Sequence, residues 1–138
     1  MLLNREALLK KQALKVEKVD LGDGEFVFVR QMTGHERELF ESMLIKRVEV
    51  NGKPDFEKSL DDFRAKLAVC TLCDADGLLL LQPADVAELS NSMSASRLAW
   101  IADAAQGLNR MSAPAQEEDL KNSDAGLADN SSSGSVEN

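Results

Sequence analysis

The chain has 138 residues and a formal net charge of −8, with 43% hydrophobic but only 4% aromatic side chains and no tyrosine. This length allows one domain with a modest core, and the low aromatic content favours helices packed through Leu, Ala and Val. An acidic chain without a basic face is a poor match for nucleic acid, because phosphate binding requires Lys and Arg.

The sequence contains no obvious targeting or membrane segment. Residues 1–6, MLLNRE, lack the basic region and long apolar core of a secretory signal. The longest apolar run, residues 78–81, is far shorter than the ~20 residues that cross a bilayer. Two cysteines, Cys70 and Cys73, suit a reducing compartment. We therefore expect a cytoplasmic protein with no membrane partner.

A short helix and a β-hairpin are predicted at the start of the chain. Asn4 is a suitable N-cap for a helix that continues to about residue 13, with Leu8 and Leu9 on one side. Residues 15–20 alternate imperfectly and predict one strand, and residues 25–30, EFVFVR, predict its partner across a Gly-rich turn. Both faces of the second strand are apolar, so helices should cover at least one of them.

A capping box marks the start of the next helix. The Thr33 hydroxyl is expected to accept a hydrogen bond from the backbone amide of Glu36, whose carboxylate accepts one from the amide of Thr33. The helix is predicted over residues 34–48, and residues 51–54, NGKP, end it. Its apolar stripe contains Leu39, Phe40, Met43, Leu44 and Val48.

The clearest helical periodicity follows, with Asp55 as the predicted cap of a helix over residues 56–73. Its stripe is expected to be core rather than a partner-binding groove, because a small domain needs such a surface for itself. A polar turn at residues 74–77 ends this helix. Residues 78–81 are predicted to be an extended segment that crosses the core or pairs with an edge of the hairpin. The predicted stripe consists of Phe56, Leu60, Phe63, Leu67 and Cys70.

Two further helices complete the predicted domain. Pro83 suits the first turn of a short helix through Leu89, with Val86 and Leu89 buried. Ser94 or a neighbouring serine caps a final helix to about residue 108. Trp100 lies off the apolar stripe of this helix, and it either packs on a neighbouring helix or is an exposed aromatic anchor for binding. The stripe itself contains Leu98, Ile101, Ala102, Ala105 and Leu108.

The composition changes after residue 111. Residues 112–138 contain six acidic residues against Lys121 alone, a net charge of −5, and few bulky apolar residues. We therefore expect a single domain over residues 1–111 and a disordered acidic tail over residues 112–138. The predicted fold class is α+β and mostly α, with an N-terminal β-hairpin packed on a small bundle of four to five helices.

The residues that suggest chemistry do not form a complete site. Cys70 and Cys73 form a CxxC motif, but a structural zinc needs four ligands and His35 is the only histidine. Two buried thiols are therefore expected. Asp74 and Asp76 hint at a calcium loop, but the register fails because the first and last ligand positions would not be carboxylates. We expect no enzyme, metal site or cofactor.

Three runs resemble the tail assembly chaperones of long-tailed, siphovirus-type bacteriophages. They are DLGDGEFVFVRQMTGHERELFE at residues 20–41, CDADGLLLLQPADVAELS at residues 73–90, and LNRMSAPAQEEDL at residues 108–120. The resemblance implies a small, largely helical protein that acts in the host cytoplasm and is absent from the mature virion. Its partners would be the tape-measure protein and the major tail-tube protein, whose polymerisation it promotes.

The resemblance also implies a second, longer form made by ribosomal frameshifting near the end of the reading frame. Asp119, Leu120 and Lys121 can be encoded as GAU-UUA-AAA, which contains a slippery U-UUA-AAA sequence. The longer form would then be a further partner of the short one. Other codons for the same residues do not slip, so the gene sequence decides this point.

Two other functions remain open from the sequence: a virion structural or head–tail connector protein, and a generic cytoplasmic adaptor. Connectors usually form closed rings, whereas a chaperone should be monomeric or weakly associating before it meets its partner. Any exposed apolar patch is a candidate for partner binding. The candidate residues are Leu8, Leu9, Trp100 and Met111.

Overall fold

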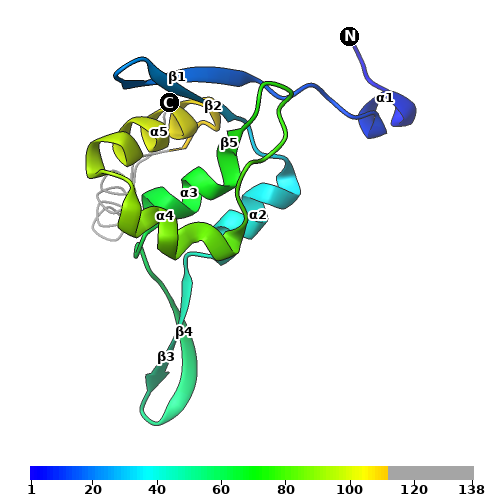
Figure 1. Ribbon diagram of the computed structural model, residues 1–138. Helices are drawn as coiled ribbons and strands as arrows, with labels where there is room; N and C mark the ends of the chain where they lie inside the picture. Colours follow the sequence, from blue (N-terminus) through cyan, green and yellow to red (C-terminus); the bar gives the residue numbers. More distant parts are fainter. Residues whose placement is uncertain (112–138) are drawn as a thin grey trace, which may run out of the picture.

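A three-stranded antiparallel sheet and the helices packed on it form the body of the protein in a computed structural model, which describes residues 1–111 (Figure 1). The sheet has the order β1-β2-β5. Its strands are β1 (Val16–Gly22), β2 (Glu25–Arg30) and β5 (Leu72–Cys73). Helices α3 (Phe63–Thr71) and α5 (Ala95–Leu108) lie against each other and against this sheet.

The predicted N-terminal hairpin is confirmed. β1 pairs with β2 from Val16 opposite Arg30 to Gly22 opposite Glu25. The turn between them places Asp23 and Gly24 at positive φ, a conformation that glycine adopts without steric cost. Val29 is fully buried on the face toward the helices, whereas Phe26 on the other face is half exposed. The second half of β2 is therefore covered by the helices, whereas Glu25 and Phe26 at its start are exposed.

Three of the expected helix starts are confirmed by their caps. Asn4 Oδ1 accepts a hydrogen bond from the amide of Ala7 and begins α1 (Arg5–Leu9), which ends four residues earlier than expected. The Thr33 capping box begins α2 (Gly34–Ser42). Ser94 Oγ accepts from the amide of Arg97 at the start of α5. Each cap satisfies backbone amides that have no partner inside the first turn.

Pro83 begins a single 3-10 turn, η1 (Pro83–Asp85), which leads into α4 (Val86–Ser92). Val86 and Leu89 were expected to be buried, but both are only half-buried. Leu89 contacts the main core cluster as one of its partly buried members. This short helix lies at the edge of α3 and of the core, so only part of each apolar side chain is covered.

The core is built on α3, whose residues from Leu67 to Thr71 are all buried. Ile101, Ala102 and Ala105 of α5 pack against it. The small alanine side chains allow the two helices to approach closely. Thr71 is polar but satisfied, since its hydroxyl donates to the carbonyl of Leu67 at 2.7 Å.

A buried ion pair joins the sheet to α2. Arg30 Nη1 and Nη2 donate to the two carboxylate oxygens of Glu36 at 2.9 and 2.8 Å, and Nη1 also donates to the carbonyl of Gln31. Glu36 Oε1 accepts in addition from the amide of Thr33, so the same carboxylate completes the capping box. Its hydrogen bonds from Arg30 hold the pKa of Glu36 below its ordinary value, although partial burial acts in the opposite direction.

The structure corrects the two helices expected between residues 34 and 73. The first ends at Ser42 and the second begins only at Phe63, because a second hairpin lies between them. Its strands are β3 (Ile45–Val50) and β4 (Lys53–Lys58). Asn51 and Gly52 have φ of 54° and 75°, and two consecutive positive φ values match the type I′ turn that fits the twist of a hairpin.

This hairpin, residues 45–58 and hereafter the arm, projects from the body on the side opposite β1 (Figure 1). Every residue of β4 is exposed, and in β3 only Val48 is half-buried. Phe56 was expected in the core, but its exposed fraction is 66%. The predicted stripe survives only in its second half, where Phe63, Leu67 and Cys70 are buried and Leu60 is partly buried.

Residues 78–81 are extended, as expected. The preceding helix, α3, ends at Thr71, two residues earlier than expected, because Leu72 and Cys73 form strand β5. The amide of Asp74 donates to the carbonyl of Leu78, and the amide of Leu80 donates to that of Leu72. The segment therefore pairs with β5, which itself pairs with β2 of the hairpin.

The helices and strands together confirm the α+β class, and the protein contains more strand than expected. The predicted tail lies outside the described residues.

Replacing Glu36 with Gln should destabilise the protein by about 2 kcal/mol at pH 7, because Arg30 would lose a charged, hydrogen-bonded partner. The folded pKa of Glu36 is lowered, so its contribution is present above the unfolded value near 4.5 and is lost as the pH falls through the folded pKa. Urea unfolding at pH 7 and pH 3 should therefore show a smaller difference between the two proteins at the lower pH. Glu38→Gln, an exposed change on the same helix, is the control. An equal effect of both variants at pH 7 would contradict this role.

The position of Phe56 outside the core is tested by a matched pair of alanine variants. Phe63→Ala removes a side chain that is 7% exposed and should cost about 3 kcal/mol. Phe56→Ala removes one that is 66% exposed and should change stability by less than about 0.5 kcal/mol. Urea denaturation measures both. Similar losses of unfolding free energy for the two variants would show that Phe56 is part of the core.

Candidate partner-binding surface

A cleft of about 240 Å³ lies where the arm leaves the body. We call it the root cleft. It combines an apolar floor with charged groups, a composition typical of surfaces that receive a partner's side chains. Its lining residues are Arg37, Phe40, Glu41, Leu44, Ile45, Lys58, Phe63 and Met111.

The apolar floor is positioned by three elements of the fold. Phe40, near the end of α2, packs edge-to-face on Phe63 at the start of α3, with ring centroids 5.6 Å apart. Leu44 continues the floor toward β3 and is buried. Such an aromatic pair is rigid and has a preferred geometry. The floor is therefore formed by core residues whose positions do not depend on a partner.

Met111 reaches the cleft because the end of α5 is anchored to the segment between β2 and α2. The amide of Met32 donates to Asn109 Oδ1 at 2.8 Å, and Asn109 Nδ2 donates to the carbonyl of Ala105. The amide of Met111 donates to the carbonyl of Gln106. These bonds fix the chain one turn beyond α5 and place the flexible thioether side chain at the cleft wall.

Charges of both signs line the cleft. Arg37 Nε lies 3.3 Å from a carboxylate oxygen of Glu41, which makes an ion pair but no hydrogen bond. Arg37 Nη1 also donates to the carbonyl of Asn109 at 3.5 Å. Because Arg37 and Glu41 are partly exposed, this pair contributes little to stability. It can instead exchange partners with charged groups of a bound chain.

The four residues proposed from the sequence are not brought together. Met111 lines the root cleft, Trp100 lies on α5 with an exposed fraction of 47%, and Leu8 and Leu9 are exposed on α1. Helix α1 stands apart from the body (Figure 1). About half of Trp100 is exposed to solvent, and its role as an anchor for binding stays a prediction.

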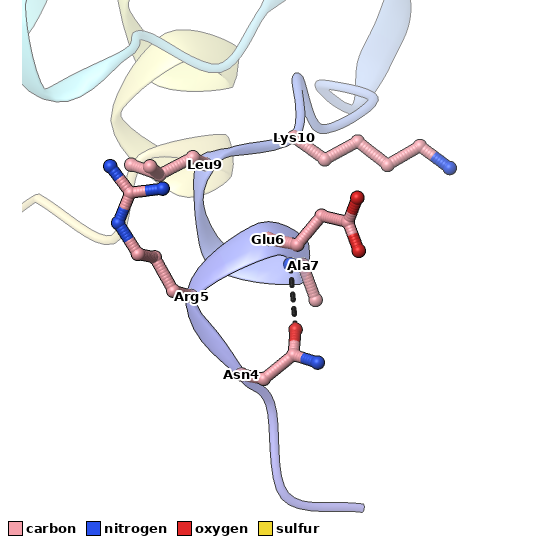
Figure 2. A pocket seen from close by; sticks show the side chains of 6 residues that line it. All are labelled: Asn4, Arg5, Glu6, Ala7, Leu9 and Lys10. Atoms are coloured by element: carbon pink, nitrogen blue, oxygen red, sulfur yellow. Dashed lines mark hydrogen bonds between the residues drawn. The ribbon is translucent and has the colours of Figure 1, made fainter.

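The hollow beside α1 is a property of that helical turn alone. Figure 2 shows that its lining comes only from residues 4–10, with the hydrogen bond from the Ala7 amide to Asn4 Oδ1 at its centre. Within residues 1–111, no residue outside this segment contributes to it. A ligand there would contact one short helix with no opposing wall, so this hollow is a poor site.

The arm exposes three apolar residues that were not predicted as a binding surface from the sequence: Ile45, Val50 and Phe56. Asn51 followed by Gly52, between segments that contain β-branched residues, is the signal that could have found them. The same two residues also predict the end of a helix, and that prediction is wrong here.

The CxxC motif lies at the junction of α3 and β5, and both cysteines are free and buried. Burial raises the pKa of Cys70 to about 11, helped by the nearby charge of Glu36, and burial also raises the pKa of Cys73. Thiolate is the reactive form of cysteine, so these raised pKa values make both side chains poor nucleophiles at neutral pH. The expectation of two buried thiols is confirmed.

The other groups considered for chemistry are placed as follows. His35 is exposed in the first turn of α2. Asp74 Oδ1 accepts hydrogen bonds from the amides of Asp76 and Leu78, so this carboxylate stabilises its own turn. Within residues 1–111, no three His, Cys, Asp or Glu side chains are grouped closely enough to hold a metal ion. In the same part of the chain, no helix is long and apolar enough to span a bilayer.

Comparison with known proteins gives no relative. No protein-family model matches the chain, and searches of curated proteins and of solved structures found no match. The candidate surface therefore rests on the geometry of the root cleft and the arm.

Proposed function

We propose that the protein is a non-catalytic tail assembly chaperone of a long-tailed phage or prophage, which binds the tape-measure protein and promotes polymerisation of the tail-tube protein. The observation that carries this proposal is the sequence resemblance of residues 20–41, 73–90 and 108–120 to such chaperones. The first run covers the β1–β2 turn, the capped start of α2 and the buried ion pair, and the second covers β5 to α4. Its place of action would be the host cytoplasm.

The root cleft supports a binding role and suggests how a helical partner is held. A helix binds in an apolar groove through a few side chains on one face. The floor of Phe40, Leu44 and Phe63 can accept one or two such side chains, and Arg37 and Glu41 can pair with charges that flank them. The tape-measure protein, as a long helical chain, would present repeated sites of this kind.

Co-expression with the tape-measure protein of the same phage genome tests this surface. Ile45→Asp places a charge at an exposed position of the cleft wall and should weaken capture about tenfold or more, since one desolvated charge costs over 1.4 kcal/mol. Leu80→Asp makes the same change at an exposed leucine of the body and should leave capture unchanged.

Affinity purification of tagged chaperone, with the co-purified tape-measure protein quantified, measures both effects. If the wild-type chain captures no tape-measure protein, the proposed function is wrong. If both variants capture as well as the wild type, the function stands but the root cleft is not the binding surface.

The gene offers an independent test of the family. Expression in the native nucleotide context with an N-terminal tag should give the short product and a minor longer one. Synonymous recoding of codons 119–122 should abolish the longer product, because slippage depends on the nucleotide sequence rather than on the amino acids. A single product before recoding would show that the gene does not frameshift. It would also weaken the chaperone assignment relative to a connector or an adaptor.

A further inference from the structure

The arm has one blocked edge and one open edge. It is a two-stranded sheet, and within residues 1–111 no other segment pairs with either strand. Pro54 lies in β4 and has no amide hydrogen, so it interrupts that edge as a template for another strand. β3 contains no proline and presents its outer backbone groups to solvent.

The turn determines which backbone groups of β3 face outward. In a two-residue hairpin, the residues that flank the turn form a hydrogen-bonded pair, here Val50 and Lys53. Hydrogen-bonded and non-hydrogen-bonded pairs then alternate along the arm, so Val48 also bonds to β4 while Arg47 and Glu49 do not. The amides and carbonyls of Arg47 and Glu49 therefore point away from β4. Pro54 is paired with Glu49 and has its missing donor on the outer edge of β4.

An identical strand can pair with this edge in few registers. Antiparallel pairing must place outward residues opposite outward residues, and among such registers the two that pair most of β3 have their two-fold axis at Arg47 or at Val48. With the axis at Arg47, the two copies of Arg47 lie directly opposite each other, and their like charges repel. An axis at Val48 instead sets Arg47 against Glu49 of the second copy, twice, with the two valines facing each other. The charge pattern of β3 favours the second register.

We propose that two copies of this chain associate through β3, antiparallel and with the two-fold axis at Val48, so that the two arms form a four-stranded sheet. Only about five residues of each strand pair, far less surface than the ~1,200 Å² or more of a stable interface, so the dimer is weak and forms at high local concentration. The outer edge of β1 is a poorer alternative, because a register irregularity between Asp20 and Gly22 interrupts it.

Engineered cysteines in the full-length chain test this register. At the axis, the two Val48 residues form a non-hydrogen-bonded pair with Cα atoms about 4.5 Å apart, within the range for a disulfide. Val48→Cys should therefore give a disulfide-linked dimer under mild oxidation. Val50→Cys is the control, since its two copies would be roughly 14 Å apart, four residues along the strand. The native cysteines are buried and do not compete.

Non-reducing gel electrophoresis over time measures the rate of dimer formation, with circular dichroism to confirm that both variants are folded. Val48→Cys should cross-link at least about tenfold faster than Val50→Cys, because pairing raises the effective concentration of its thiols. Random collision would favour Val50, which is the more exposed position. Equal rates, or faster cross-linking at Val50, would overturn the proposed register.

Charge reversal tests the same interface without cysteines. Arg47→Glu and Glu49→Arg should each lower the dimer fraction in sedimentation velocity at high protein concentration, because each puts like charges opposite one another. The double variant exchanges the two charges and should restore the dimer. Failure of the double variant to recover association, or a wild-type chain that stays monomeric at ~1 mM, would contradict the proposal.

Discussion

The bidentate bond between Arg30 and Glu36 is the contact on which the arrangement of the body depends. It pairs Nη1 and Nη2 of a guanidinium that is almost fully buried at the end of β2, and its carboxylate also completes the cap of α2. A buried charge without its partner costs several kcal/mol, so the end of the strand and the start of the helix are constrained together. The direction in which α2 leaves the sheet follows from this constraint.

The root cleft and the arm are consequences of that direction. Helix α2 carries Phe40 onto Phe63 of α3, which closes the core and forms the cleft floor. The chain then leaves the body at Leu44 and returns at Ser59, whose amide donates to the carbonyl of Leu44 at 2.6 Å. Between these residues the arm has little burial to stabilise it, and an isolated hairpin is marginally stable in water. The protein thus combines a firmly packed body with a weakly supported arm.

Elements that are determined by a few adjacent residues could be predicted from the sequence. The prediction was wrong where a helical spacing of apolar residues competed with a turn signal. The β1–β2 hairpin and the caps at Asn4, Thr33 and Ser94 were found because a few adjacent residues determine them. Residues 45–58 also contain apolar residues at helical spacing, and that pattern outweighed the turn at Asn51 and Gly52. Of the residues that line the root cleft, only Met111 is predicted from the sequence to bind a partner, whereas Phe40, Leu44 and Phe63 are predicted as core. The root cleft could not be predicted, because its lining comes from α2, both arm strands, α3 and the end of α5, whose packing no local pattern reports.

The body and the arm should differ in local stability, and hydrogen–deuterium exchange of the dilute wild-type protein measures this difference directly. Amides of Leu67 to Thr71 in α3 and of Val29 in β2 should exchange only through global unfolding, since these residues are buried in the core. Amides of residues 45–58 should exchange orders of magnitude faster, through opening of the arm alone. Protection of the arm equal to that of α3 at low protein concentration would contradict the account, because the arm would then be part of the same cooperative unit.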